Sequence, residues 1–213
     1  MKRTVKNSPA PNRDIRAFFN EIAKKSPNPG LLKKFAAAVG ADVRHPETGF
    51  TPLMAAADTG SAFTIRTLLT AGAAPGTHGV KRFTPLMIAA GKGRTQIAEI
   101  LLDAGAGPNA QNIFGNTALA EAISAKHPGT ATRLVRKGAK PNICDKSGWT
   151  PLMTAACSGQ GTTVHMLLNA GADAVAQNKT GMTAGMLADQ NGHRHVSALI
   201  DARSRKGRSN PKF

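Results

Sequence analysis

The motif Thr-Pro-Leu-Met occurs three times in this chain, at residues 51–54, 84–87 and 150–153. The first two copies are 33 residues apart, and the third follows after twice that interval. Thr117 and Thr183 occupy the two other positions of the same period. A fixed period in this range is typical of proteins built from stacked repeats, because each unit buries its apolar face against its neighbours. The sequence therefore predicts a solenoid.

Residues 84–116 form the clearest repeat unit. Thr84 can cap a helix through its hydroxyl group, and Pro85 fits the first helical position, where its missing N–H would be unpaired anyway. After two glycines, apolar residues at three- and four-residue spacing predict a second helix over about 94–104. Residues 106–116 contain Pro, Asn and Gly, which favour an extended, turn-rich finger before the next unit begins.

The period predicts one domain over residues 14–203, in about six units that include a cap at each end. Terminal units need a polar outer side, because no further unit covers them. The expected units are residues 14–50, 51–83, 84–116, 117–149, 150–182 and 183–203. Basic segments at 1–13 and 204–213 have the composition of disordered tails.

The recurring order of Thr-Pro-Leu, Ala-Ala, Gly, Leu-Leu, Gly-Ala and a Pro/Asn finger resembles the ankyrin repeat, and the resemblance covers about residues 14–203. The chain departs from this family at two kinds of position. Met54, Met87 and Met153 stand where the family usually has His, so thioether packing is expected to replace a Thr–His hydrogen bond. Arg82 stands where a finger usually has Gly, so we expect this finger to be distorted.

The resemblance implies an all-α repeat solenoid whose finger loops are β-hairpins. Short inner helices and fingers would line a concave groove, and the second helices would form the convex back. Members of the family generally bind other macromolecules, mostly proteins, and carry no catalytic chemistry. We therefore expect an interaction protein that is not an enzyme, needs no cofactor or metal, and is a monomer.

The residue before each repeat Thr is the first candidate for partner contact, because the family places this position on the finger, facing the groove. Large apolar side chains are enriched at interfaces, and three of these five residues are aromatic in a chain that is only 4% aromatic. The alternative is that they brace one finger against the next. The five residues are Phe50, Phe83, Asn116, Trp149 and Met182.

Basic and apolar side chains beside this row complete the predicted site. A basic rim around aromatic groups suits an acidic protein segment, and it would also suit single-stranded nucleic acid, whose bases stack on aromatic faces. The alternative is a solvated rim without a partner. The cations are Lys81, Arg82, Lys146 and Lys179 on the fingers and Lys92 at the end of an inner helix. The other candidates are Asp58 and Ser158, equivalent to Lys92, and Ile113 and Phe114 on the third finger.

The net charge of +16 lies mainly on the two ends of the chain. Basic termini favour a second interpretation, a nucleic-acid or ribonucleoprotein component. No apolar stretch is long enough for a membrane span, no apolar region follows the basic N-terminal residues as in a secretory signal, and two cysteines make no disulfide framework. We expect a cytoplasmic protein, with a nuclear location or an effector delivered into host cells as alternatives.

Overall fold

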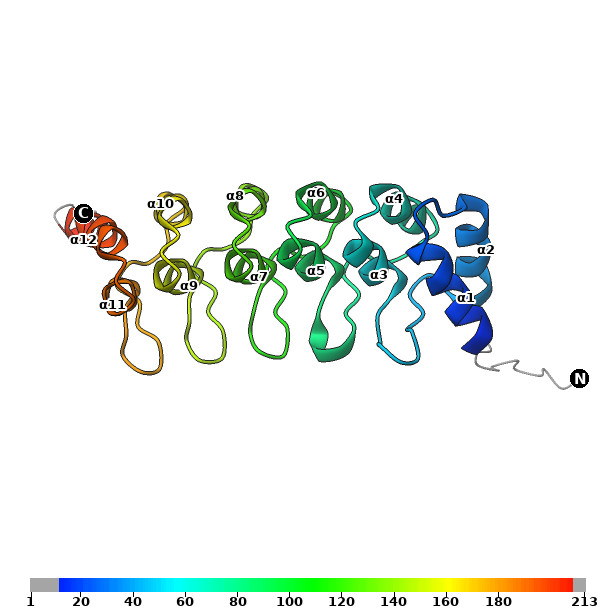
Figure 1. The fold of residues 1–213 in the computed structure, drawn as a ribbon, viewed down its shortest axis with the longest axis horizontal. Helices are drawn as coiled ribbons and strands as arrows, with labels where there is room; N and C mark the ends of the chain where they lie inside the picture. Colours follow the sequence, from blue (N-terminus) through cyan, green and yellow to red (C-terminus); the bar gives the residue numbers. More distant parts are fainter. Residues whose placement is uncertain (1–11, 209–213) are drawn as a thin grey trace, which may run out of the picture.

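The computed structural model describes residues 12–208, with side chains as far as Arg205, and shows one row of helix pairs with fingers along one side (Figure 1). The inner helices are α3 (Pro52–Thr59), α5 (Pro85–Gly91), α7 (Ala118–Ser124), α9 (Pro151–Cys157) and α11 (Ala184–Gln190). The outer helices are α4 (Ala62–Thr70), α6 (Thr95–Asp103), α8 (Pro128–Arg136), α10 (Gly161–Asn169) and α12 (Arg194–Arg208). The helix pairs repeat with the expected period, so this part of the chain is the predicted all-α solenoid.

A first helix pair, α1 (Asn12–Ala23) and α2 (Pro29–Val39), closes the N-terminal end of the stack (Figure 1). Helix α1 packs on α3 and α2 packs on α4, so this pair continues the two rows. Glu21 of α1 is almost fully buried and accepts hydrogen bonds from the Asn28 backbone N–H and the Lys24 ammonium group. These two donors lower the pKa of Glu21 below its ordinary value, because both stabilise the ionised carboxylate.

Each inner helix begins at a repeat Thr in the way that the sequence predicts. The Thr hydroxyl accepts a hydrogen bond from the backbone N–H three residues later, which satisfies one of the unpaired donors of the first turn. In α5, for example, the Met87 backbone N–H donates to Thr84 Oγ1 at 3.2 Å. The same bond is present at all five positions of the period, Thr51, Thr84, Thr117, Thr150 and Thr183.

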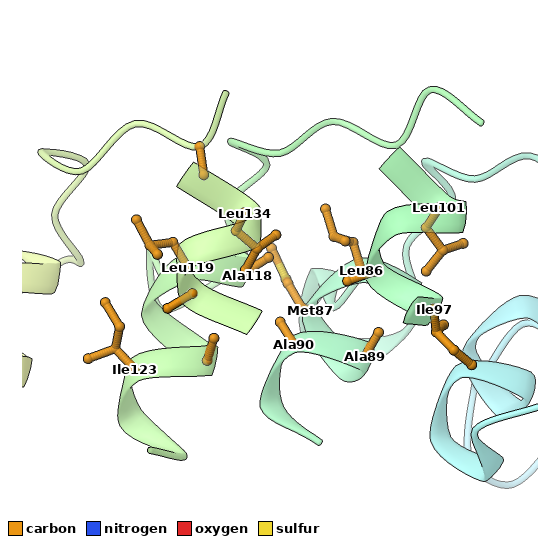
Figure 2. Close-up of a cluster of buried hydrophobic side chains, with 14 of the residues drawn as sticks. Leu86, Met87, Ala89, Ala90, Ile97, Leu101, Ala118, Leu119, Ile123 and Leu134 are labelled. Atoms are coloured by element: carbon orange, nitrogen blue, oxygen red, sulfur yellow. The ribbon is translucent and has the colours of Figure 1, made fainter. Parts of the chain in front are cut away.

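The core runs through the stack as a thin layer of aliphatic side chains between the helix rows (Figure 2). Ala89 and Ala90 are fully buried on α5, and their small side chains let neighbouring inner helices approach closely. Met87 is also buried and extends between α5 and α7. Met54 and Met153 are buried in the same way, so thioether packing takes the place that the family usually gives to His.

The fingers differ from the expected β-hairpins, because residues 12–208 contain no β-strand. Each finger is instead a turn, closed in the third unit by a backbone bond from Asn112 N to Asn116 O. Only a single backbone bond links this finger to the preceding one, from Ile113 N to Lys81 O at 3.0 Å. A strand ladder needs successive bonds along both edges, which these short loops do not provide.

The expected tails also need correction where the structure describes them. Helix α1 begins at Asn12, and α12 continues to Arg208, so residues 12–13 and 204–208 are helical. No Pro occurs before position 211 to stop α12, Arg and Lys are good helix formers, and cations near a helix C-terminus are favourable. The remaining parts of the predicted tails, 1–11 and 209–213, lie outside the described residues.

Candidate functional site

The row of residues before each repeat Thr is half-buried throughout. Phe83, Trp149 and Met182 pack against the hydrophobic core with part of each side chain, and the remaining part is accessible. These residues therefore contribute to the packing of the stack and also offer apolar surface beside the inner helices. Phe50 and Asn116 occupy the same positions in their units.

A hollow of about 500 Å³ brings five of the predicted site residues together, from four successive units of the stack. Its walls are mainly apolar and come from two fingers and from one face of α5. The apolar lining consists of Phe50, Val80, Phe83, Met87 and Ile88. The charged lining consists of Asp58, Lys81, Lys92 and Glu121. We call this hollow the groove pocket.

Two of the charged residues in the groove pocket neutralise each other. Lys92 follows the end of α5 and Asp58 lies in the last turn of α3, and Lys92 Nζ is 3.1 Å from Asp58 Oδ1. Both side chains are about half exposed, so this ion pair contributes little to stability. The ion pair matters for binding, because Lys92 already has an anionic partner, Asp58, at the edge of the pocket.

Glu121 also lines the groove pocket, and sequence reasoning did not select it as a candidate, because the fourth unit was interpreted as a degenerate repeat. It lies in the first turn of α7, and its Oε1 accepts hydrogen bonds from Asn112 Nδ2 and Asn116 Nδ2, both at 3.2 Å. Burial raises the pKa of Glu121 above its ordinary value, although the two amide hydrogen bonds oppose the rise. One sequence feature could have indicated this residue: Asn116 and Glu121 are both polar, whereas the preceding unit has the apolar residues Phe83 and Ile88 at the same two positions.

The tip of the second finger is distorted, as the replacement of Gly by Arg82 predicts. Residues Val80–Arg82 form one turn of 3₁₀ helix, and Lys81 and Arg82 both have left-handed backbone angles, with φ of 55° and 58°. This conformation directs Lys81 Nζ over the ring of Phe114 on the next finger, 5.7 Å from its centroid.

A second hollow, of about 580 Å³, lies between the second, third and fourth fingers. Arg82, Ile113 and Lys146 line it together with Cys144 and Asp145. Ile113 is 40% exposed and Phe114 47% exposed, so the finger tips present apolar surface among cations. We call the exposed residues Lys81, Arg82, Ile113, Phe114, Lys146 and Lys179 the finger-tip surface.

The structure does not bring all the predicted site residues into one place. Trp149, Ser158, Lys179 and Met182 lie farther toward the C-terminal end and line neither of the two hollows. Ser158 is half-buried at the end of α9, and Lys179 is exposed on the last finger, bonded through its backbone N–H to Ser147 O. These residues extend the surface along the stack and do not add to the groove pocket.

Other chemistry is sparse in the part of the chain that the structure describes. No three His, Cys, Asp or Glu side chains within it gather closely enough to hold a metal ion. Cys144 is exposed and Cys157 half-buried, and both are free thiols. None of the described helices is long and apolar enough to cross a bilayer.

The model of the family described as ankyrin repeats in three copies matches the chain at residues 20–112 and 104–178. Since these matches extend over well over half of the chain, the protein belongs to the ankyrin repeat family. Ankyrin repeats are generally protein–protein interaction modules, and the family is typically non-enzymatic. No curated protein matches the chain.

Proposed function

We propose that this protein is a non-enzymatic adaptor that binds an acidic segment of a partner protein along its concave face. The observation that carries this proposal is the groove pocket, because it joins Phe50 and Phe83 of two fingers to the half-buried Ile88 of an inner helix. Concave apolar hollows with a few polar groups at their edges are the usual form of a binding site. The pocket can receive an apolar part of a partner segment.

The charge of the finger-tip surface supports an acidic partner. Among the described residues, the side chains of Lys81, Arg82, Lys146 and Lys179 make no ion pair with an Asp or Glu. Two cations on or next to an outer helix do form ion pairs, since Arg133 pairs with Glu99 and Lys137 pairs with Asp103. The cations next to the groove are thus available to anionic groups of a partner, which would raise the association rate and the specificity.

The test compares charge reversals on the two faces of the molecule. Lys81→Glu, Lys146→Glu and Lys179→Glu together should reduce partner capture at least about tenfold, because rim charges steer binding. The matched control reverses three exposed cations outside the groove, Arg66, Arg136 and Lys140, with the same change in net charge. Tagged variants are incubated with nuclease-treated native lysate, and the captured proteins are quantified by mass spectrometry.

A second pair of variants tests the apolar part of the same face. Phe83→Ala and Trp149→Ala together should abolish capture, since truncated aromatic anchors at an interface commonly cost about 2 kcal/mol or more. Both side chains also contact the core, so circular dichroism must show that the double variant stays folded at the assay temperature. Equal capture by the wild type, the groove variants and the control would place the site elsewhere on the molecule.

A nucleic-acid-associated function is the alternative that rests on the basic ends of the chain. Binding to nucleic acid should weaken steeply as salt rises, and deletion of residues 1–12 and 204–213 should flatten that dependence. Unchanged binding by the shortened chain would exclude this alternative. A monomeric state and a cytoplasmic location complete the proposal, and the effector alternative has no support from particular residues.

A further inference from the structure

The fourth unit places a carboxylate at a position where the preceding unit has an apolar side chain. Asn116 stands where the preceding unit has Phe83, and Glu121 stands where that unit has Ile88. The two replacements contact each other, because Asn116 Nδ2 donates to Glu121 Oε1. Exceptions to the repeat pattern that pair with one another are expected where a solenoid carries function.

The geometry leaves one oxygen of this carboxylate available to the groove pocket. Asn112 Nδ2 and Asn116 Nδ2 both donate to Oε1, and these are the hydrogen bonds that orient the side chain. Asn112 is itself held in place, since its Oδ1 accepts backbone N–H bonds from Phe114 and Asn116. Glu121 Oε2 is therefore the acceptor that remains for a group entering the pocket.

Glu121 also lacks a counter-charge in the described part of the chain. Its two donors are neutral amides, and neither cation of the pocket lining pairs with it, because Lys92 is held by Asp58 and Lys81 Nζ lies over the Phe114 ring. A half-buried carboxylate without an ion-pair partner is costly for the fold, and a partner that covered it with apolar surface would add to that cost. An acidic side chain at this point would be repelled.

The walls of the groove pocket suit a long side chain with a cationic end. Phe50, Phe83 and Ile88 offer apolar surface to an aliphatic stem, while Glu121 lies in the same lining. Lys and Arg side chains bury their methylene stems against apolar surface and keep the charged head beside an acceptor. A guanidinium group could in addition donate two hydrogen bonds to the carboxylate group of Glu121.

We propose that Glu121 determines the specificity of the groove by pairing with a Lys or Arg side chain of the partner segment. This inference rests on the proposed function and refines it. The partner segment would carry one basic residue that enters the groove pocket, next to acidic residues that meet the finger-tip cations Lys81, Arg82 and Lys146. Opposite charges at neighbouring positions would also fix the register of the segment in the groove.

The experiment selects phage-displayed random 12-residue peptides on the immobilised full-length protein and on its Glu121→Gln variant. Gln keeps the shape of the side chain and one acceptor oxygen. Since burial raises the pKa of Glu121, the ionised form is disfavoured in the folded state, and Glu121→Gln should be at least as stable as the wild type at pH 7.5. The wild type should enrich peptides with one Lys or Arg among Asp and Glu residues, and the variant should keep the acidic residues but lose the basic one.

A double-mutant cycle then measures the pair directly with one selected peptide. Replacing its basic residue by norleucine should weaken binding about tenfold to the wild type and less than about twofold to Glu121→Gln. Asp103→Asn is the matched control, because Asp103 is an exposed acid on α6 paired with Lys137, away from the groove pocket. This control should behave as the wild type does in both assays.

Different outcomes of these experiments would contradict the role of Glu121 and the proposed groove function. Acidic peptides that contain no enriched basic residue, and that still need Lys81 and Lys146, would overturn the role of Glu121 and leave the groove function intact. A basic residue equally enriched by Glu121→Gln would overturn it as well. Peptides whose binding is unaffected by the finger-tip charge reversals, or the absence of any selected peptide, would overturn the proposed groove function itself.

Discussion

Two basic residues in this protein adopt the left-handed backbone conformation at positions where other units have glycine. Arg82 has a φ of 58° in the second finger, and Lys126 has a φ of 60° between α7 and α8. At the position of Lys126, the other units have Gly60, Gly93, Gly159 and Gly192, all with positive φ. A side chain in this conformation costs about 1–2 kcal/mol, because Cβ approaches the following carbonyl oxygen.

Lys126→Gly should therefore stabilise the protein by about 0.5–1 kcal/mol, since the relief of strain exceeds the added freedom of the unfolded chain. Chemical denaturation followed by circular dichroism measures the difference. The matched control is Ala125→Gly in the same turn, where φ is −83° and Gly should destabilise by about 0.5–1 kcal/mol. Equal destabilisation by both substitutions would show that Lys126 stores no strain.

At the scale of the elements, the turns between paired helices depend on contacts with the next unit. A Cβ atom added at Gly93 would lie 2.6 Å from His127 Nδ1, so the imidazole packs directly on the glycine. In the next unit Lys126 occupies the glycine position, and Gln160 replaces the histidine. Gln160 Nε2 reaches back to the Ile123 carbonyl oxygen at 2.9 Å. The replacement of Gly by Lys126 in one unit is thus accompanied by the replacement of His by Gln160 in the next unit.

Two Gly→Ala substitutions should accordingly have opposite effects. Gly185 lies within α11, and an added Cβ would make ordinary contacts, the nearest 3.5 Å from Asp201 Oδ1, so Gly185→Ala should stabilise by about 0.5–1 kcal/mol. Gly93→Ala should destabilise by about 1–2 kcal/mol, because it combines a positive φ with the His127 contact. Thermal unfolding resolves both changes, and shifts of the same sign would contradict this account.

At the scale of the whole molecule, stability is shared between neighbouring units. Helices α11 and α12 cover the end of the stack with buried side chains such as Leu187, Val196 and Ile200. Their outer side is more polar, since Asp189 and Asp201 are exposed. We therefore expect the last unit to act as the cap that a linear array requires.

Deletion of residues 183–213 should lower the midpoint of unfolding strongly, because it exposes apolar side chains of α9 and α10 such as Leu152 and Leu167. We also expect self-association, which size-exclusion chromatography would detect. A chain ending at Arg208 keeps every described helix and is the control. Unchanged unfolding after the longer deletion would mean that the final unit does not cap the stack.

Only part of the candidate site could be predicted from the sequence. The period, the Thr caps and the aromatic positions before each Thr can be read from single units, because capping and helix formation are local. Sequence reasoning proposed Phe50, Phe83 and Lys92 as contact residues, and all three line the groove pocket. That a partner binds there stays a prediction. It gave the fingers strands that they lack, since pairing between loops depends on how adjacent units stack.

The amino-acid sequence by itself determined the architecture of this protein, because a 33-residue period of helix signals can bury its apolar faces only by stacking. Only the tertiary structure decided which charges near the groove are neutralised and which are not. Lys92 and Asp58 come from different units. Asn112, on the finger before α7, donates a hydrogen bond to Glu121 in the first turn of α7. Such pairings depend on the distances between packed elements, which no single repeat encodes.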